Sequence, residues 1–126
     1  MATVSWSTTP LRTYGNNVVV VSWSPITTTN NDGQRFEMPG SADRSVQVFG
    51  TFGAGGTITF QGSNEATPAA WVTLAAAGDA TEDMVFTASD MKQLLESTRW
   101  VRPLLSGGDG TTSLTVLMLA RRPAPA

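Results

Sequence analysis

Two β-rich runs separated by a glycine loop constrain the fold more than any other part of this sequence. Apolar residues occupy alternate positions in both runs, at Val46, Val48, Ile58 and Phe60. The loop between the runs reads Gly53-Ala54-Gly55-Gly56. Apolar residues at every second position are typical of strands that bury one face. Because the connecting loop is short and rich in glycine, the segment 44–64 is predicted to form an antiparallel hairpin in the wall of a β-sandwich.

The remainder of the chain adds further short strands, with turn residues about every ten positions. Extended runs are predicted over residues 18–23, 34–38, 70–74, 84–87, 98–102 and 111–120. One short helix is predicted near 90–96, because Ser89 can cap its first turn and Asp90 suits the positive end of the helix dipole. About eight strands at this spacing predict an all-β fold, an antiparallel β-sandwich or jelly roll.

The 126 residues have the length of a single domain. We expect an N-terminal arm over residues 1–16, where Pro10 and the pair Asn16-Asn17 interrupt regular structure. The β-sandwich is expected over 17–122, with a flexible tail over 123–126. The N-terminus lacks the features of a signal peptide, and the apolar run 18–21 is too short to span a bilayer. We therefore expect synthesis in the cytoplasm and no membrane partner.

The composition argues against reaction chemistry. The chain has no His and no Cys, which removes the commonest general base, the usual transition-metal ligand and any disulfide framework. Charged residues make up 14% of the chain, compared with about 25% in typical soluble proteins. The Lys and Arg residues are scattered rather than clustered. We expect no catalysis, metal, cofactor or nucleic acid, and a neutral surface of the kind that often faces other protein in an assembly.

Three motifs that could carry chemistry are better explained as turns or loops. The 53–56 glycine loop lacks the Lys-Ser or Lys-Thr of a phosphate-binding loop. The segment Gly107-Gly108-Asp109-Gly110 offers calcium one carboxylate, where about six to eight oxygens are needed. The acidic residues near Glu82 and Asp83, with Asp79 close in sequence, include adjacent carboxylates that would point to opposite faces of a strand. That arrangement does not suit the paired carboxylates of a glycosidase.

Apolar residues outside the expected core are the candidates for contacts with a partner. In the last strand, Leu114, Val116 and Met118 share the core face. The other face could be covered by the arm or helix, or could lie in a subunit interface. Trp71 and Trp100 fall within strand patterns, which favours core packing over stacking on sugars. The candidate partner contacts are Trp6, Leu11 and Tyr14 in the arm, and Phe49, Leu117 and Leu119 on outward strand positions.

Several motifs, taken in order, resemble a family of small tailed-bacteriophage virion proteins of the head decoration, or cement, type. They are Ala42-Asp43-Arg44-Ser45-Val46-Gln47-Val48, Gln61-Gly62-Ser63-Asn64, Trp71-Val72-Thr73-Leu74, Arg99-Trp100-Val101-Arg102-Pro103 and Gly107-Gly108-Asp109-Gly110-Thr111-Thr112. The resemblance covers residues 17–122. It implies a non-enzymatic protein on the capsid surface of the virion, which binds the lattice of the major capsid protein and stabilises it. It also implies a homo-oligomer, most often a trimer.

A looser resemblance points to a different function. Gly62-Ser63-Asn64, Trp71 and Arg99-Trp100-Val101-Arg102 are similar to the pattern in galactose-binding-like jelly rolls of the discoidin type. That resemblance implies a carbohydrate-binding module carried by the virion, with a glycan as partner. A head–tail or tail structural component is a third interpretation of the same features.

Overall fold

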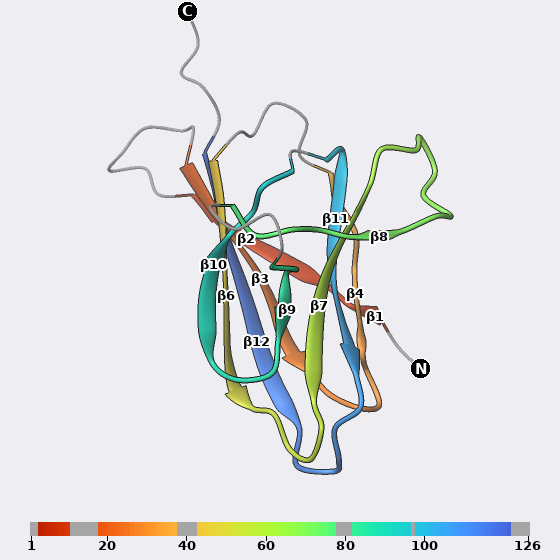
Figure 1. Ribbon diagram of the computed structural model, residues 1–126, viewed down its shortest axis with the longest axis vertical. Coiled ribbons are helices and arrows are strands. Elements are labelled where there is room, and N and C mark those ends of the chain that lie inside the picture. The colour runs from red at the N-terminus through yellow and green to blue at the C-terminus, as the bar shows by residue number, and fades with distance from the viewer. Residues whose placement is uncertain (1–2, 11–17, 38–42, 78–81, 97, 122–126) are drawn as a thin grey trace, which may run out of the picture.

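The computed structural model describes residues 3–10, 18–37, 43–77, 82–96 and 98–121. The described residues form two β-sheets that face each other, and they contain no helix (Figure 1). The order in the five-stranded sheet is β10 (Asp90–Gln93), β6 (Asp43–Thr51), β12 (Ser113–Arg121), β3 (Val18–Ile26) and β2 (Trp6–Pro10). The order in the seven-stranded sheet is β1 (Thr3–Val4), β4 (Asp32–Gly33), β11 (Trp100–Ser106), β7 (Thr57–Ser63) and β8 (Val72–Thr73), with β5 (Phe36–Glu37) beside β11 and β9 (Val85–Phe86) beside β7.

The connectivity is that of a jelly roll. The antiparallel pairs β3–β12, β4–β11, β6–β10 and β7–β8 are nested, from strands near the two ends of the chain to consecutive strands in its middle, and successive pairs alternate between the two sheets. Strand β2 extends the five-stranded sheet beyond β3, and β1 pairs in parallel with β4. The predicted all-β antiparallel sandwich is therefore confirmed.

The core lies between the sheets and is built by alternating residues from both. The alternating apolar residues of β6 and β7, Val46, Val48, Ile58 and Phe60, are all fully buried, and so is the inner face of β12. Trp23 is also fully buried and packs edge-on against Phe60, with ring centroids 6.0 Å apart. The core residues are Val4, Val21, Trp23, Ile26, Val46, Val48, Ile58, Phe60, Leu74, Ala76, Met84, Phe86, Leu94, Val101, Leu105, Leu114, Val116, Met118 and Ala120.

The predicted hairpin over 44–64 is wrong, although both of its strands exist. Strand β6 pairs with β10 and β12, whereas β7 pairs with β11, β8 and β9 in the opposite sheet. The 53–56 loop is therefore an arch that carries the chain from one sheet to the other, at the lower end of Figure 1. Alternation reports which face of a strand is buried, and both inner faces bury against the same core, so the pattern is identical for an arch and a hairpin.

The helix predicted near 90–96 is also wrong. Residues 90–93 form β10, which pairs antiparallel with residues 45–48 at the edge of the five-stranded sheet. The pairing continues past β10, because the Leu94 amide donates to the Arg44 carbonyl at 2.9 Å. A short isolated helix is poorly stabilised, whereas this edge pairing occupies backbone groups of β6. The carboxylate of Asp90 still accepts the N–H of Met91, as a local turn contact rather than a helix cap.

The expected N-terminal arm differs from the observed structure in its described part. Residues 6–10 form β2, whose residues pair with 19–23 of β3, and residues 3–4 form β1 in the other sheet. Strand β3 also continues through Pro25, where the pairing register with β12 shifts; a proline is tolerated at such an irregularity. The expected tail over 123–126 lies outside the described residues. No helix that could cross a membrane is found in the part of the chain that the structure describes.

Candidate functional site

The outward side of the five-stranded sheet collects most of the sequence-predicted contact residues. Because Val46, Val48, Val116 and Met118 point into the core, the residues between them point outward. The register places Leu117 between Gln47 and Ser22, and Leu119 between Ser45 and Val20. We call this surface the neutral face; its residues are Ser7, Thr9, Val20, Ser22, Ser45, Gln47, Phe49, Met91, Gln93, Thr115, Leu117 and Leu119.

Large apolar side chains on the neutral face are open to solvent. Met91 is 57% exposed, Phe49 40% and Leu119 37%, and Leu117 is half-buried between its neighbours. Phe49 lies directly opposite Thr115 and therefore diagonal to Leu117, within the reach of an aromatic side chain. The structure thus brings Phe49, Leu117 and Leu119 onto one surface, as the sequence predicted for outward strand positions.

The same face carries a hollow of about 340 Å³. Its lining residues include Met91 and Gln93 on β10 and Leu119 on β12, with Ser45 between them on β6. The hollow exists because a small serine stands between longer side chains on the two flanking strands. Sequence reasoning missed Met91, because a helix was predicted where β10 runs. No local signal could have found it, because exposed Met91 alternates with Lys92, whose side chain is largely buried, against the usual pattern of strands.

The neutral face is almost without charge in its described part. Serine, threonine and glutamine fill the positions between the apolar side chains. Charged residues occur at the end of the face, where Arg121 on β12 pairs with Asp43 on β6, and buried Arg44 contributes to the lining of the hollow. Lys92 on β10 turns away from this surface, toward Glu82 and the carbonyl of Val85. A partner can therefore cover the face without removing many charges from water, which would cost free energy.

Trp6, the described one of the three arm candidates, does not join this surface. Trp6 lies in β2 and is half-buried, with its ring 5.0 Å from that of Phe36 at an interplanar angle of 89°. Its indole N–H donates to the Arg35 carbonyl at 3.1 Å. The Trp6 side chain thus packs within its own chain and is not free to anchor a partner. Leu11 and Tyr14 lie outside the described residues.

Trp71 and Trp100 lie on the outward side of the seven-stranded sheet, half-buried, and not in the core as expected. The guanidinium of Arg102 lies 4.2 Å from the Trp71 ring centroid, and that of Arg35 lies 4.8 Å from the Trp100 centroid. Arg102 also binds Gln61 and Asp32. These cation–π contacts occupy ring surface on which a sugar would otherwise stack.

The two glycine loops meet each other at one end of the sandwich. Both are arches between sheets, and the Gly108 amide donates to the Ala54 carbonyl at 3.1 Å. The carboxylate of Asp109 accepts hydrogen bonds from the Thr111 side chain and from the amides of Ala54 and Thr111, which together lower the pKa of Asp109. Its oxygens thus bind protein donors within the turn that the sequence predicted.

The acidic residues near Glu82 also serve the structure. Glu82 forms an ion pair with Lys92 at 2.8 Å, and Asp83 lies in a bridge opposite Ala75. Asp79 is not among the described residues. Within the described ranges, no three His, Cys, Asp or Glu side chains gather closely enough to hold a metal ion.

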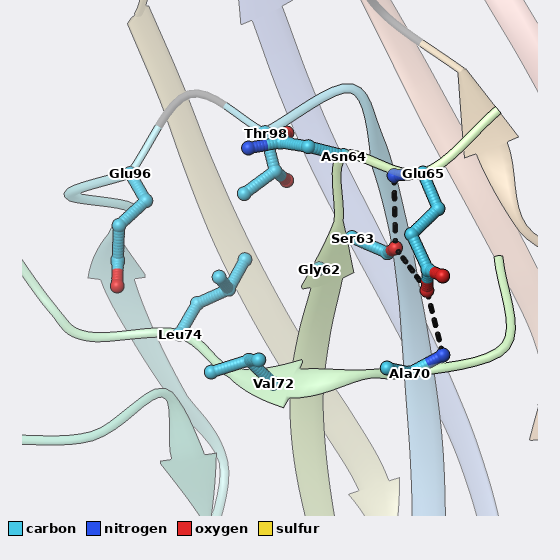
Figure 2. A pocket seen from close by; sticks show the side chains of 9 residues that line it. All are labelled: Gly62, Ser63, Asn64, Glu65, Ala70, Val72, Leu74, Glu96 and Thr98. Carbon is cyan, nitrogen blue, oxygen red and sulfur yellow. Dashed lines mark hydrogen bonds between the residues drawn. The ribbon is translucent and has the colours of Figure 1, made fainter.

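A second concave site, which sequence reasoning missed, lies beside the end of β7 (Figure 2). It is a pocket of about 580 Å³ with an apolar floor that includes Leu74 and Val72, the latter 64% exposed. Glu65 and Glu96 stand on opposite sides in the view of Figure 2. The remaining lining residues are Gly62, Ser63, Asn64, Ala70 and Thr98.

Both carboxylates of this pocket are oriented by backbone N–H groups. Oε1 of Glu65 accepts from the amides of Ala70 at 2.7 Å and Ala69 at 3.1 Å, and from the Ser63 hydroxyl at 3.3 Å. These bonds, led by that of Ala70, lower the pKa of Glu65. Oε1 of Glu96 accepts from the Ala75 amide at 2.8 Å. In the described structure every one of these bonds goes to Oε1.

Comparison with known proteins identifies no relative of the chain. No protein-family model, no curated protein and no solved structure matches it. A functional assignment therefore depends on the two surfaces described above.

Proposed function

We propose that this protein is a structural component of a bacteriophage virion, a decoration or cement protein that binds the assembled capsid lattice and stabilises it. The observation that carries the proposal is the neutral face. It presents exposed Phe49, Met91 and Leu119 on one side of a sheet, the last two beside a hollow, and the polar residues between them are mostly serine, threonine and glutamine. Exposed apolar clusters rimmed by polar residues mark protein interaction sites.

The chemistry of the face suits a protein partner. A single large side chain of the partner could fill the 340 Å³ hollow beside Leu119, in the manner of an interface anchor surrounded by contacts that exclude water. The serine, threonine and glutamine residues could then form hydrogen bonds at the rim. In this account the major capsid protein supplies the partner surface.

The fold and the sequence resemblance add weaker support. Jelly rolls occur in viral capsid proteins and in lectins alike, so the topology by itself does not choose between functions. The resemblance to phage decoration proteins favours the capsid, and it favours a trimer. A weak single contact is sufficient on a shell, because many copies, or several subunits of one oligomer, bind together.

The proposed role predicts a measurable change in the particle. Shells that carry the protein should resist heat and osmotic shock better than shells prepared without it, and adding the purified protein back should restore the resistance. Equal resistance of both kinds of shell would contradict the cement role. Labelled protein found on the tail rather than the head in electron micrographs would instead favour a tail component.

A further inference from the structure

The five-stranded sheet ends in β10 on one side and in β2 on the other. An edge strand presents unpaired N–H and C=O groups, which can pair with a strand of another molecule. We propose that Asp90 and Gln34 are edge guards, whose side chains bind the outward N–H groups of these two strands and so prevent copies of the protein from joining edge to edge. The inference goes beyond the proposed capsid role and does not depend on it.

The backbone pairing of β10 shows which of its residues face away from the sheet. The Leu94 amide donates to the Arg44 carbonyl of the neighbouring strand. Along an antiparallel strand, residues that bond to the neighbour alternate with residues that do not. Met91, Gln93 and Leu95 therefore turn their backbone N–H and C=O groups outward. These are the positions at which a strand of another molecule would have to bond.

The segment 75–77 of the same chain covers two of these outward positions. The Gln93 carbonyl accepts the amide of Ala77 at 2.7 Å, and the Leu95 amide donates to the carbonyl of Ala75 at 3.0 Å. Met91 lies beyond this cover, and its N–H donates to Oδ1 of Asp90 at 2.8 Å. Asp90 thus occupies the donor that the covering segment leaves open, and it adds a charge at the edge.

The opposite edge is guarded in a similar way. The Trp6 amide donates to Oε1 of Gln34 at 3.3 Å, and not to Trp23, its partner residue in β3. By the same alternation, Trp6, Thr8 and Pro10 are the outward residues of β2. A proline has no backbone N–H. Exposed Thr8 is therefore the outward residue of β2 that keeps an open donor.

One isolated donor is a poor start for a strand pair. A further antiparallel strand bonds at outward positions two residues apart, and Thr8 has a bound N–H on one side and a proline on the other. A strand that displaces a guard gives up its hydrogen bond, and one net hydrogen bond changes an association constant roughly two- to tenfold. Because both edges are guarded and the neutral face lies open, association is directed to the face.

Amide hydrogen exchange in the whole protein, measured by NMR, tests the guard contacts themselves. After correction for intrinsic rates, the Met91 and Trp6 amides of wild type should exchange several-fold more slowly than the Thr8 amide. Asp90→Ala should remove the protection of Met91. Asp90→Asn is the matched control, because it keeps an oxygen acceptor without the charge and should retain most of the protection. Equal exchange of all three amides in wild type would overturn the inference.

Sedimentation velocity over a concentration series tests the consequence. Asp90→Ala and Gln34→Met should each raise the self-association constant roughly two- to tenfold over wild type, and the double variant should raise it further. Ser106→Met is the control for added apolar surface, because Ser106 is exposed on β11 in the other sheet. Urea titration verifies that each variant is folded, and the two edges give independent variants.

The result also separates the edges from the neutral face. Phe49→Ser added to the double variant should leave the new association intact, because the association runs through the edges. Association at the wild-type level in both folded guard variants would overturn the inference, as would its loss on adding Phe49→Ser. Neither result requires a capsid, so failure here leaves the proposed capsid role standing, and failure to bind shells leaves the guards standing.

Discussion

The carboxylate of Asp109 accepts a hydrogen bond from the backbone N–H of Ala54 at 2.9 Å, and so joins the two glycine arches. A second bond supports the junction, from the Thr112 hydroxyl to the Phe52 carbonyl at 2.8 Å. Each arch crosses between the sheets, so the contact also fixes how the ends of the sheets meet. This end of the sandwich is therefore a stabilising feature, and its acidic residue makes stability depend on pH.

Stability should fall in acid, in part through Asp109. Its pKa in the folded protein lies below the ordinary value of 3.8, chiefly because the Thr111 hydroxyl and the Ala54 amide bind the charged form. The contribution is complete above that value and is lost as the pH falls through the lower, folded pKa. Urea midpoints measured from pH 7 down to acid should decline less steeply for Asp109→Asn than for wild type. Superimposable acid limbs for the two proteins would contradict this role.

Two glycines of the first arch should respond differently to alanine. Both Gly53 and Gly55 have a φ near +70°, so each substitution should cost about 1–2 kcal/mol of unfolding free energy. A Cβ on Gly53 would also lie 2.5 Å from Oδ1 of Asp109 and 2.5 Å from the Thr112 hydroxyl, whereas a Cβ on Gly55 meets nothing within 4 Å. Gly53→Ala should therefore cost at least about 1 kcal/mol more. Equal unfolding free energies for the two variants would show that the arches do not pack as described.

Lys92 should contribute more to the free energy of unfolding than an exposed lysine does. Its ammonium donates to the Val85 carbonyl at 2.9 Å and lies 5.1 Å from the Phe86 ring centroid, so it ties β10 to β9 across the two sheets. Lys92→Met keeps the apolar stem but removes the donors, and should cost about 1–2 kcal/mol of unfolding free energy. Glu82→Gln, which weakens only the exposed ion pair, should cost less than about 0.5 kcal/mol. Denaturant titration of both variants tests this; a larger loss for Glu82→Gln would contradict it.

The sequence predicted which residues are buried better than it predicted which strands pair. Two-residue alternation at Val46 and Ile58 reports a buried face, and that part is confirmed. Alternation contains no information about the partner strand, so an arch between sheets resembled a hairpin within one. The prediction for the segment 90–96 was wrong for a different reason. Local capping chemistry favoured a helix there, but pairing with β6 makes the segment a strand.

The residues of the candidate site were likewise predictable only in part from the sequence. Outward positions such as Leu117 and Leu119 follow from alternation alone, and the structure places them together on the neutral face. Met91 joins them only through the pairing of β10 with β6, which no local pattern reveals. The pocket with Glu65 and Glu96 is assembled from segments about 30 residues apart in sequence, and long-range contacts of that kind cannot be deduced from spacing.

The central claim is that the neutral face docks on the capsid lattice, and co-sedimentation with shells that lack the protein tests it most directly. Phe49→Ser and Leu119→Ser should remain folded, as urea titration can check, because both side chains lie outside the core, and they should lose most of the shell binding. Leu104→Ser is the matched control, on an outward position of β11 in the other sheet. The account predicts that wild type and Leu104→Ser sediment with the shells while the two face variants stay in solution. Full binding by folded Phe49→Ser and Leu119→Ser would contradict it.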